Sequence, residues 1–178
     1  ARQLDPLWVI IPFNVSLALI CARRFEEAER QMRDLMDLDS RLEGTYWFLS
    51  SALAGQGRIE EAITVLEKGV PLVFRAPFFL ALLGLWYARA GRRDDAEAVL
   101  AELLAGGFCP PVWLAILCGG LGHIDRAFGY LEQAIEQHND QVCLMGVDHR
   151  FDELRHDPRF PVLMTRIGLP LALLPSAQ

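Results

Sequence analysis

The side chains of this chain best suited to chemistry lie close together near its C-terminal end. Two histidines and three aspartates gather there: His149 and His156 with Asp148, Asp152 and Asp157. Imidazole and carboxylate groups at such short spacing can hold a metal ion. Three arginines alternate with them, namely Arg150, Arg155 and Arg159. Because arginine competes for the same carboxylates through ion pairs, we interpret this stretch as a salt-bridged pair of terminal helices and predict no metal site.

The motifs of enzymes and cofactor-binding proteins do not occur in the sequence. It contains no phosphate-binding loop of the G-x-x-x-x-G-K-[ST] type, no H-E-x-x-H and no G-x-S-x-G. Two glycine-rich stretches, at 105–109 and 118–123, lack the preceding strand and the following lysine that a phosphate loop needs. The sequence therefore predicts a protein that is not an enzyme, with no catalytic residue and no cofactor.

Composition excludes further classes of function. The 178 residues carry a net charge of −6 with both signs interspersed, so no basic stripe is present for direct nucleic-acid binding. The apolar run at 7–22 contains Pro12, Asn14 and Ser16 and is shorter than the roughly 20 apolar residues of a membrane span. Four cysteines at irregular spacing, Cys21, Cys109, Cys118 and Cys143, are typical of small buried side chains in a reducing compartment, which predicts a cytoplasmic protein.

One sequence pattern recurs along the chain and indicates how the chain is organised. The stretches beginning at 23, 57, 91 and 122 align on four alanines: Ala28, Ala62, Ala96 and Ala127. The glycines Gly57, Gly91 and Gly122 precede acidic residues and then apolar residues at helical spacing. An internal period of 34, 34 and 31 residues is the signature of stacked repeat units.

A second small residue stands twelve positions before each alanine, inside a preceding apolar segment: Ser16, Ser50, Gly84 and Ala115. Two small residues, one on each helix, allow two antiparallel helices to approach closely. Each unit is therefore predicted to be a helical hairpin, and because one hairpin cannot bury its apolar face alone, the hairpins are expected to stack.

This pattern resembles the tetratricopeptide repeat (TPR), over about residues 9–138. The resemblance implies an all-α solenoid of about four stacked TPR hairpins, at about 9–42, 43–76, 77–107 and 108–139, within residues 1–139. Residues 140–178 are expected to form C-terminal capping helices and a tail. The arrangement is similar to the C-terminal TPR region of bacterial multidomain regulators that begin with a winged-helix, nucleotide-cyclase or kinase domain. It implies that the chain is the C-terminal part of a larger regulatory protein.

In such a solenoid the first helix of each hairpin lines the concave side, and this side is predicted to bind the partner. The predicted contact residues are Phe13, Asn14, Leu17, Trp47, Phe48, Ser51, Phe78, Leu82, Leu85, Arg89, Trp113 and Ile116. Trp86 is expected to lie in the core instead. For the other aromatic residues of the list and for Leu82, the alternative stays open that they pack between helices or are covered by another part of the parent chain or by a second copy. The second helices carry charged residues such as Arg30 and Asp37, which predicts a solvated convex face.

Two functions remain open. The apolar, aromatic-rich list predicts a protein-interaction scaffold that takes an amphipathic helix or an extended apolar peptide, and a homodimer is a further possibility. TPR domains that clamp acidic chaperone tails use a lysine where this chain has Ile10, so that partner is disfavoured although Asn14 fits. The alternative is a sensor of a small apolar or carboxylated ligand, with Arg89 meeting the carboxylate.

Overall fold

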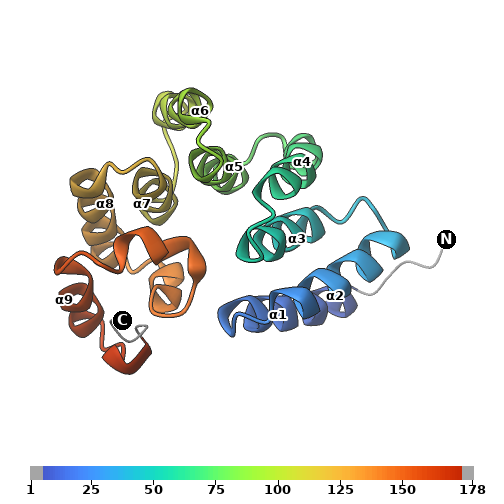
Figure 1. The fold of residues 1–178 in the computed structure, drawn as a ribbon, viewed down its shortest axis with the longest axis horizontal. Coiled ribbons are helices and arrows are strands. Elements are labelled where there is room, and N and C mark those ends of the chain that lie inside the picture. The colour runs from blue at the N-terminus through green and yellow to red at the C-terminus, as the bar shows by residue number, and fades with distance from the viewer. Residues whose placement is uncertain (1–5, 174–178) are drawn as a thin grey trace. The chain divides into compact units, whose positions relative to one another are not determined.

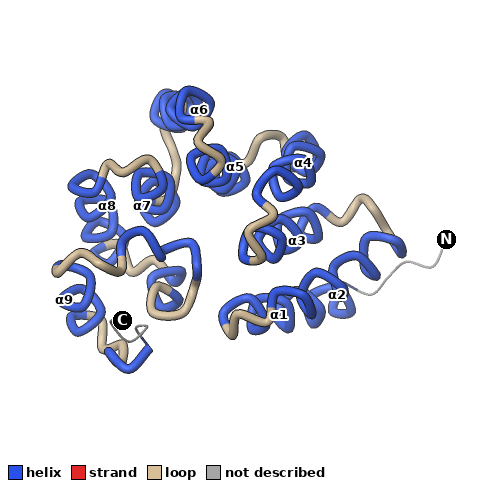
Figure 2. The backbone as a smooth tube through the Cα atoms, in the orientation of Figure 1, coloured by secondary structure: helices blue, strands red, loops and turns tan. Residues whose placement is uncertain are grey.

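The computed structural model describes residues 6–173, and every regular element in that range is a helix (Figures 1 and 2). The chain divides into two compact units, Ala1–Arg75 and Ala76–Gln178. Among the described residues, no helix combines the length and the apolarity that a membrane crossing requires.

The first unit contains two helical hairpins. Its elements are α1 (Pro6–Cys21), α2 (Phe25–Leu38), α3 (Glu43–Gly55), α4 (Ile59–Gly69) and the 3₁₀ helix η1 (Val70–Val73). Helix α1 packs on α2, α3 packs on α4, and α3 also packs on α2 of the preceding hairpin. Ala52 of α3 joins the buried cluster formed by Ile20, Phe25 and Ala28 of the first hairpin.

The second unit contains two further hairpins and a C-terminal helical segment. Its elements are α5 (Pro77–Arg89), α6 (Arg93–Ala105), α7 (Pro111–Gly120), α8 (Ile124–Glu136), η2 (Asp140–Leu144), η3 (His149–Leu154), α9 (Arg159–Arg166) and η4 (Leu171–Leu173). Helix α5 packs on α6 and α7, α7 packs on α8, and η3 packs on α7. The predicted all-α architecture of four hairpins followed by a helical segment is confirmed.

The small residues of the repeat lie where close helix packing requires them. All four repeat alanines and their partners Ser16, Ser50 and Ala115 are fully buried. A Cβ added at Gly84 would meet Leu117 at 2.8 Å and Val99 at 3.0 Å, so this glycine permits the approach of both α6 and α7. The turn glycines Gly57, Gly91 and Gly122 have φ values of 78°, 76° and 76°, which glycine adopts without steric cost.

Enlarging a repeat alanine tests this packing. We expect Ala96→Leu in α6 to lower the free energy of unfolding by about 1–3 kcal/mol, because Ala96 is fully buried and a larger side chain must displace its neighbours. Ala98→Leu is the matched control, since Ala98 lies on the same helix but is exposed. Urea denaturation of both variants measures the difference, and equal midpoints would contradict the close packing at Ala96.

Candidate interaction surface

The structure divides the predicted contact residues by exposure. Trp47, Ser51, Leu82, Leu85, Trp113 and Ile116 are buried, Phe13, Leu17, Phe48 and Arg89 are half-buried, and Asn14 and Phe78 are exposed. Trp86 is fully buried, as predicted for a core residue. The buried members pack within their own units, so the half-buried and exposed members are those that present surface to a partner.

In the second unit, the chain itself occupies the face formed by the first helices of its hairpins. Arg89, at the end of α5, donates to both carboxylate oxygens of Glu153 in η3, from Nε at 2.6 Å and from an Nη at 2.9 Å. The same guanidinium donates to the carbonyl oxygen of His149 at 2.7 Å. The cation predicted to receive the carboxylate of a ligand therefore holds a carboxylate of this chain.

Ring contacts extend the same interface. The imidazole of His149 stacks on the indole of Trp86 at 5.7 Å between centroids, with the two planes only 6° apart. The guanidinium of Arg150 lies 5.0 Å from the ring centre of Trp113. A Cβ added at Gly119 of α7 would meet Leu154 at 3.1 Å, so η3 lies directly against α7. Together these contacts account for the burial of Trp113 and for the half-burial of Arg89.

The segment that covers this face begins with a buried ion pair. Asp148 is fully buried and Arg150 is 3% exposed. The Asp148 carboxylate accepts from the backbone nitrogen of Arg150 at 3.0 Å and from its Nε at 2.8 Å. Although burial alone would raise the pKa of Asp148, the charge and hydrogen bonds of Arg150 outweigh it and hold that pKa at about 2.

His149 lies beside this pair in a dry environment. Burial lowers the pKa of its imidazole to about 3, and the nearby guanidinium groups of Arg89 and Arg150 add to that shift, while Asp148 and Asp152 oppose it. The ring is therefore neutral at pH 7. Its Nδ1 lies 3.3 Å from an Nη of Arg89.

The acids and bases of the C-terminal segment pair with one another as predicted. Arg155 contacts Asp152 at 2.8 Å, and Arg159 contacts Asp157 at 2.8 Å and Asp125 of α8 at 2.9 Å. His156 is exposed. Within residues 6–173, no group of three or more histidine, cysteine, aspartate or glutamate side chains is arranged to hold a metal ion.

In the first unit the corresponding surface is formed by α1 and α3. The rings of Phe13 and Phe48 stack at 5.4 Å, and the edge of Trp47 meets Phe48 at 4.8 Å. A Cβ added at Gly44 would lie 2.7 Å from the Phe13 ring. Because Gly44 has no side chain, the ring can pack against α3. Asn14 and Ile10 are exposed beside these rings. We call Ile10, Phe13, Asn14, Leu17 and Phe48 the α1–α3 surface.

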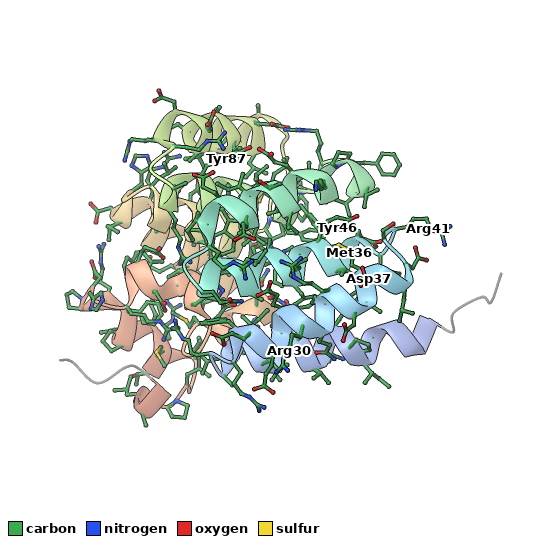
Figure 3. The ribbon with its side chains drawn as sticks, turned by 45° about the vertical axis from the view of Figure 1, so that its right-hand side comes forward. Arg30, Met36, Asp37, Arg41, Tyr46 and Tyr87 are labelled. Carbon is green, nitrogen blue, oxygen red and sulfur yellow. The ribbon has the colours of Figure 1, made fainter. Side chains whose placement is uncertain are left out.

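The outer face of α2 differs in chemistry from this surface. Arg30 and Asp37 are exposed on α2, with Arg41 in the loop that follows it (Figure 3). Arg33 and Arg58 both pair with Glu29, at 2.8 Å each. Glu29 itself is only 12% exposed, whereas Arg30, Asp37 and Arg41 are exposed and form a solvated face as predicted.

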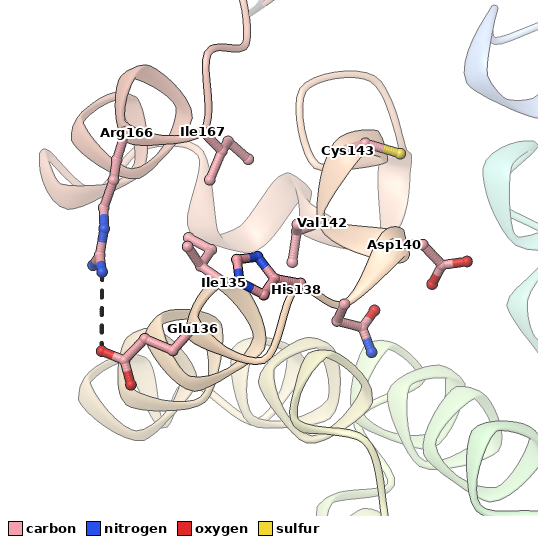
Figure 4. Close-up of a pocket in the computed structure, with 9 residues that line it drawn as sticks. Ile135, Glu136, His138, Asp140, Val142, Cys143, Arg166 and Ile167 are labelled. Carbon is pink, nitrogen blue, oxygen red and sulfur yellow. Dashed lines mark ion pairs between the residues drawn. The ribbon is translucent and has the colours of Figure 1, made fainter.

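A cleft of about 550 Å³ in the second unit has no counterpart in the sequence pattern (Figure 4). It is lined by Ile135, Glu136, His138, Asn139, Asp140, Val142, Cys143, Arg166 and Ile167. Arg166 and Glu136 form an ion pair of 3.9 Å beside it. His138 has a φ of 53°, which turns the chain from α8 into η2. None of the predicted contact residues lines this cleft.

The cysteines differ partly from the prediction. All four are free thiols, but only Cys118 is buried, Cys21 and Cys109 are half-buried, and Cys143 is exposed at the cleft. Desolvation raises the pKa values of Cys109 and Cys118 to about 11, so these two thiols stay protonated at pH 7.

Comparison with solved structures identifies the fold. The chain is similar to TTC0263, a thermophilic TPR protein of Thermus thermophilus, with 25% identity, a TM-score of 0.59 and coverage of 86% of this chain and 83% of that one. It is also similar to a chain of the APC/C hetero-tetramer Cut9–Hcn1, with 14% identity and a TM-score of 0.62, over 89% of this chain and only 30% of that one. No protein-family model and no curated protein matches the sequence. The helical hairpins of this chain therefore have the TPR fold.

Proposed function

We propose that this chain is a protein-interaction scaffold and that the α1–α3 surface receives an apolar segment of a partner. The proposal rests on one observation, which is that the equivalent face of the second unit is covered by a helical segment of the chain. There the chain's own η3 lies against α7, with Leu154 on Gly119 and Glu153 on Arg89. A face of this kind thus accepts a short helical segment, and in the first unit Phe13, Asn14 and Phe48 offer a similar face.

The chemistry of the α1–α3 surface specifies an uncharged, apolar contact segment. Helix α1 contains no charged residue between Pro6 and Cys21, and α3 contains only Glu43. The two stacked phenylalanines supply apolar area, and the amide of Asn14 can give or accept one hydrogen bond. We infer that the partner supplies an amphipathic helix, since its apolar stripe fits this surface while its polar side stays in water.

Two features disfavour the alternative of a carboxylated small ligand at Arg89. The guanidinium already makes a bidentate contact with Glu153, and it also donates to the His149 carbonyl. A ligand carboxylate would have to displace both. We therefore place the function in partner binding without enzymatic activity, in a regulatory protein of a reducing compartment such as the cytoplasm.

A binding experiment tests the α1–α3 surface. The probe is a labelled amphipathic helical peptide with blocked ends, and we expect binding in the micromolar range by fluorescence anisotropy. Asn14→Glu should raise the dissociation constant at least tenfold, because it places a charge in an apolar interface without disturbing the core. Arg30→Glu on the outer face of α2 is the control and should bind like the wild type. Equal affinity of Asn14→Glu and wild type would contradict the proposed surface.

A further inference from the structure

The cleft lined by α8, η2 and α9 in the second unit has the size and the lining of a small-molecule site. We call it the α8–α9 cleft. Its volume of about 550 Å³ lies within the range of ligand pockets. Ile135, Val142 and Ile167 supply its apolar part, and Figure 4 shows them between Arg166 on one side and Asp140 on the other. This lining matches a ligand that has an apolar chain with a polar group at one end.

Arg166 offers this cleft a cation that a ligand can reach. Its ion pair with Glu136 spans 3.9 Å, which is longer than a hydrogen bond, and the two side chains are 50% and 65% exposed. Arg89 differs, because its guanidinium is 16% exposed and donates to both carboxylate oxygens of Glu153. A guanidinium binds a carboxylate through two parallel N–H groups. A ligand carboxylate can therefore bind Arg166 without breaking a hydrogen bond to Glu136.

His138 lines the same cleft in a backbone conformation that is unfavourable for its residue type. Each of the helices α5 to α9 is followed, one position after its C-cap, by a residue with positive φ. Four of these residues are glycine, and the fifth is His138 with a φ of 53°. Glycine would make the same turn at a lower steric cost. Backbone strain of this kind is concentrated at ligand sites, and an imidazole donates at least one hydrogen bond in either charge state.

Two acidic side chains at the cleft limit the ligand to one negative charge. Glu136 and Asp140 both line the cleft, and Asp140 lies on the side away from Arg166 (Figure 4). A ligand with a carboxylate at each end would bring its second carboxylate toward Asp140. Because equal charges at a contact oppose binding, the lining favours a ligand whose far end is uncharged.

We propose that the α8–α9 cleft binds a small monocarboxylate with an apolar chain. The carboxylate contacts Arg166, the chain lies on Ile135, Val142 and Ile167, and His138 supplies a further polar contact. The site lies within the second unit and shares no residue with the α1–α3 surface. It can therefore be present or absent whatever the outcome for partner binding.

Titration of the full chain with hexanoate, followed by NMR chemical shifts at constant ionic strength, tests the site. We expect a dissociation constant on the order of 1 mM, because the probe has few atoms. Hexanamide keeps the chain but has no charge, and adipate adds a second carboxylate. Both should bind at least about tenfold more weakly than hexanoate. Equal binding of the three probes, or no binding of hexanoate at ten times the expected constant, would overturn the proposal.

Substitutions separate the contribution of the charge from that of the apolar lining. Arg166→Gln, at an exposed position, should raise the dissociation constant of hexanoate at least about tenfold and abolish its advantage over hexanamide. Ile167→Ala should weaken both probes alike. Arg126→Gln is the matched control, since Arg126 is exposed on α8 but does not line the cleft. If Arg166→Gln binds hexanoate like the wild type, the carboxylate does not bind at Arg166 and the proposed site is wrong.

The thiol of Cys143 reports whether the probe occupies the cleft itself. Cys143 is exposed and lines the cleft, whereas Cys21 is half-buried in the first unit. Saturating hexanoate should slow the alkylation of Cys143 by iodoacetamide and leave that of Cys21 unchanged, as measured by mass spectrometry of the peptides. Arg166→Gln should lose this protection at the same hexanoate concentration. An alkylation rate of Cys143 that hexanoate does not change would place the probe outside the cleft and overturn the proposal.

Discussion

Replacing Asp148 by asparagine is expected to lower the free energy of unfolding by about 3–5 kcal/mol at pH 7, as for other broken buried ion pairs. Asparagine has the same shape and its side-chain oxygen can still accept from the backbone nitrogen of Arg150. The variant therefore removes the charge alone. It leaves the guanidinium of Arg150, which is 3% exposed, without the carboxylate that now compensates its burial.

The chain contains two matched controls for this variant. Asp39 and Asp157 each accept from the backbone nitrogen and from Nε of the arginine two positions later, at 2.9–3.0 Å, as Asp148 does from the backbone of Arg150. Their arginines are 86% and 43% exposed. We expect Asp39→Asn and Asp157→Asn to leave the urea midpoint nearly unchanged. If all three variants behave alike, burial is not what makes the Asp148 pair important.

The pH dependence of this pair has a definite sign. The pKa of Asp148 lies near 2 in the folded chain, below its ordinary value of 3.8. A depressed carboxyl pKa contributes stability that is fully present above the unfolded pKa and is lost as pH falls through the folded pKa. The difference in the free energy of unfolding between wild type and Asp148→Asn should therefore be constant near neutral pH. It should shrink as the pH falls from about 4 toward about 2.

These three aspartate–arginine pairs also show why the sequence predicted some features and missed others. The repeat was predictable because each hairpin must hide the same apolar edge, so its small residues recur at a fixed period, as at Ala62 and Ala96. The ion pairs have the same sequence pattern at 39–41, 148–150 and 157–159, and local spacing predicts each contact. Spacing does not report burial, which for Asp148 depends on helices elsewhere in the chain.

The candidate surface was predicted less completely for a related reason. The repeat places the concave positions on the first helices, but for their aromatic residues the pattern leaves two interpretations, contact with a partner or cover within the chain. Asn14 is exposed and Phe13 is half-buried. The contact of Arg89 with Glu153 joins residues 64 positions apart and belongs to no period. A segment outside the repeat can pack on the hairpins without any period in its sequence that would predict the contact. The sequence therefore leaves open whether Trp113 is covered by the chain itself, and it does not indicate Glu153 as the partner of Arg89.

Lowering the pH from 6.5 to 4.5 is expected to cost about 2 kcal/mol of stability through His149 alone. The pKa of His149 is depressed to about 3 in the folded chain, against an ordinary value of 6.5. Between these two values the unfolded chain binds a proton that the folded chain does not bind, so stability falls by about 1.4 kcal/mol for each pH unit. Well above pH 6.5 the imidazole is neutral in both states and contributes no pH dependence.

His149→Phe isolates this contribution from that of the carboxylates. Phenylalanine keeps a flat ring to stack on Trp86, as the imidazole does at 5.7 Å, but it has no proton to gain. Urea unfolding at a series of pH values should show a slope between pH 6.5 and 4.5 that is shallower in this variant by about 1.4 kcal/mol per unit. His156→Gln, at an exposed position, should keep the wild-type slope. If the free energy of unfolding varies with pH in the same way in His149→Phe and wild type, the imidazole takes up its proton freely in the folded chain. His149 would then not be held in a buried contact with Trp86, and η3 would be only loosely packed on α5 and α7.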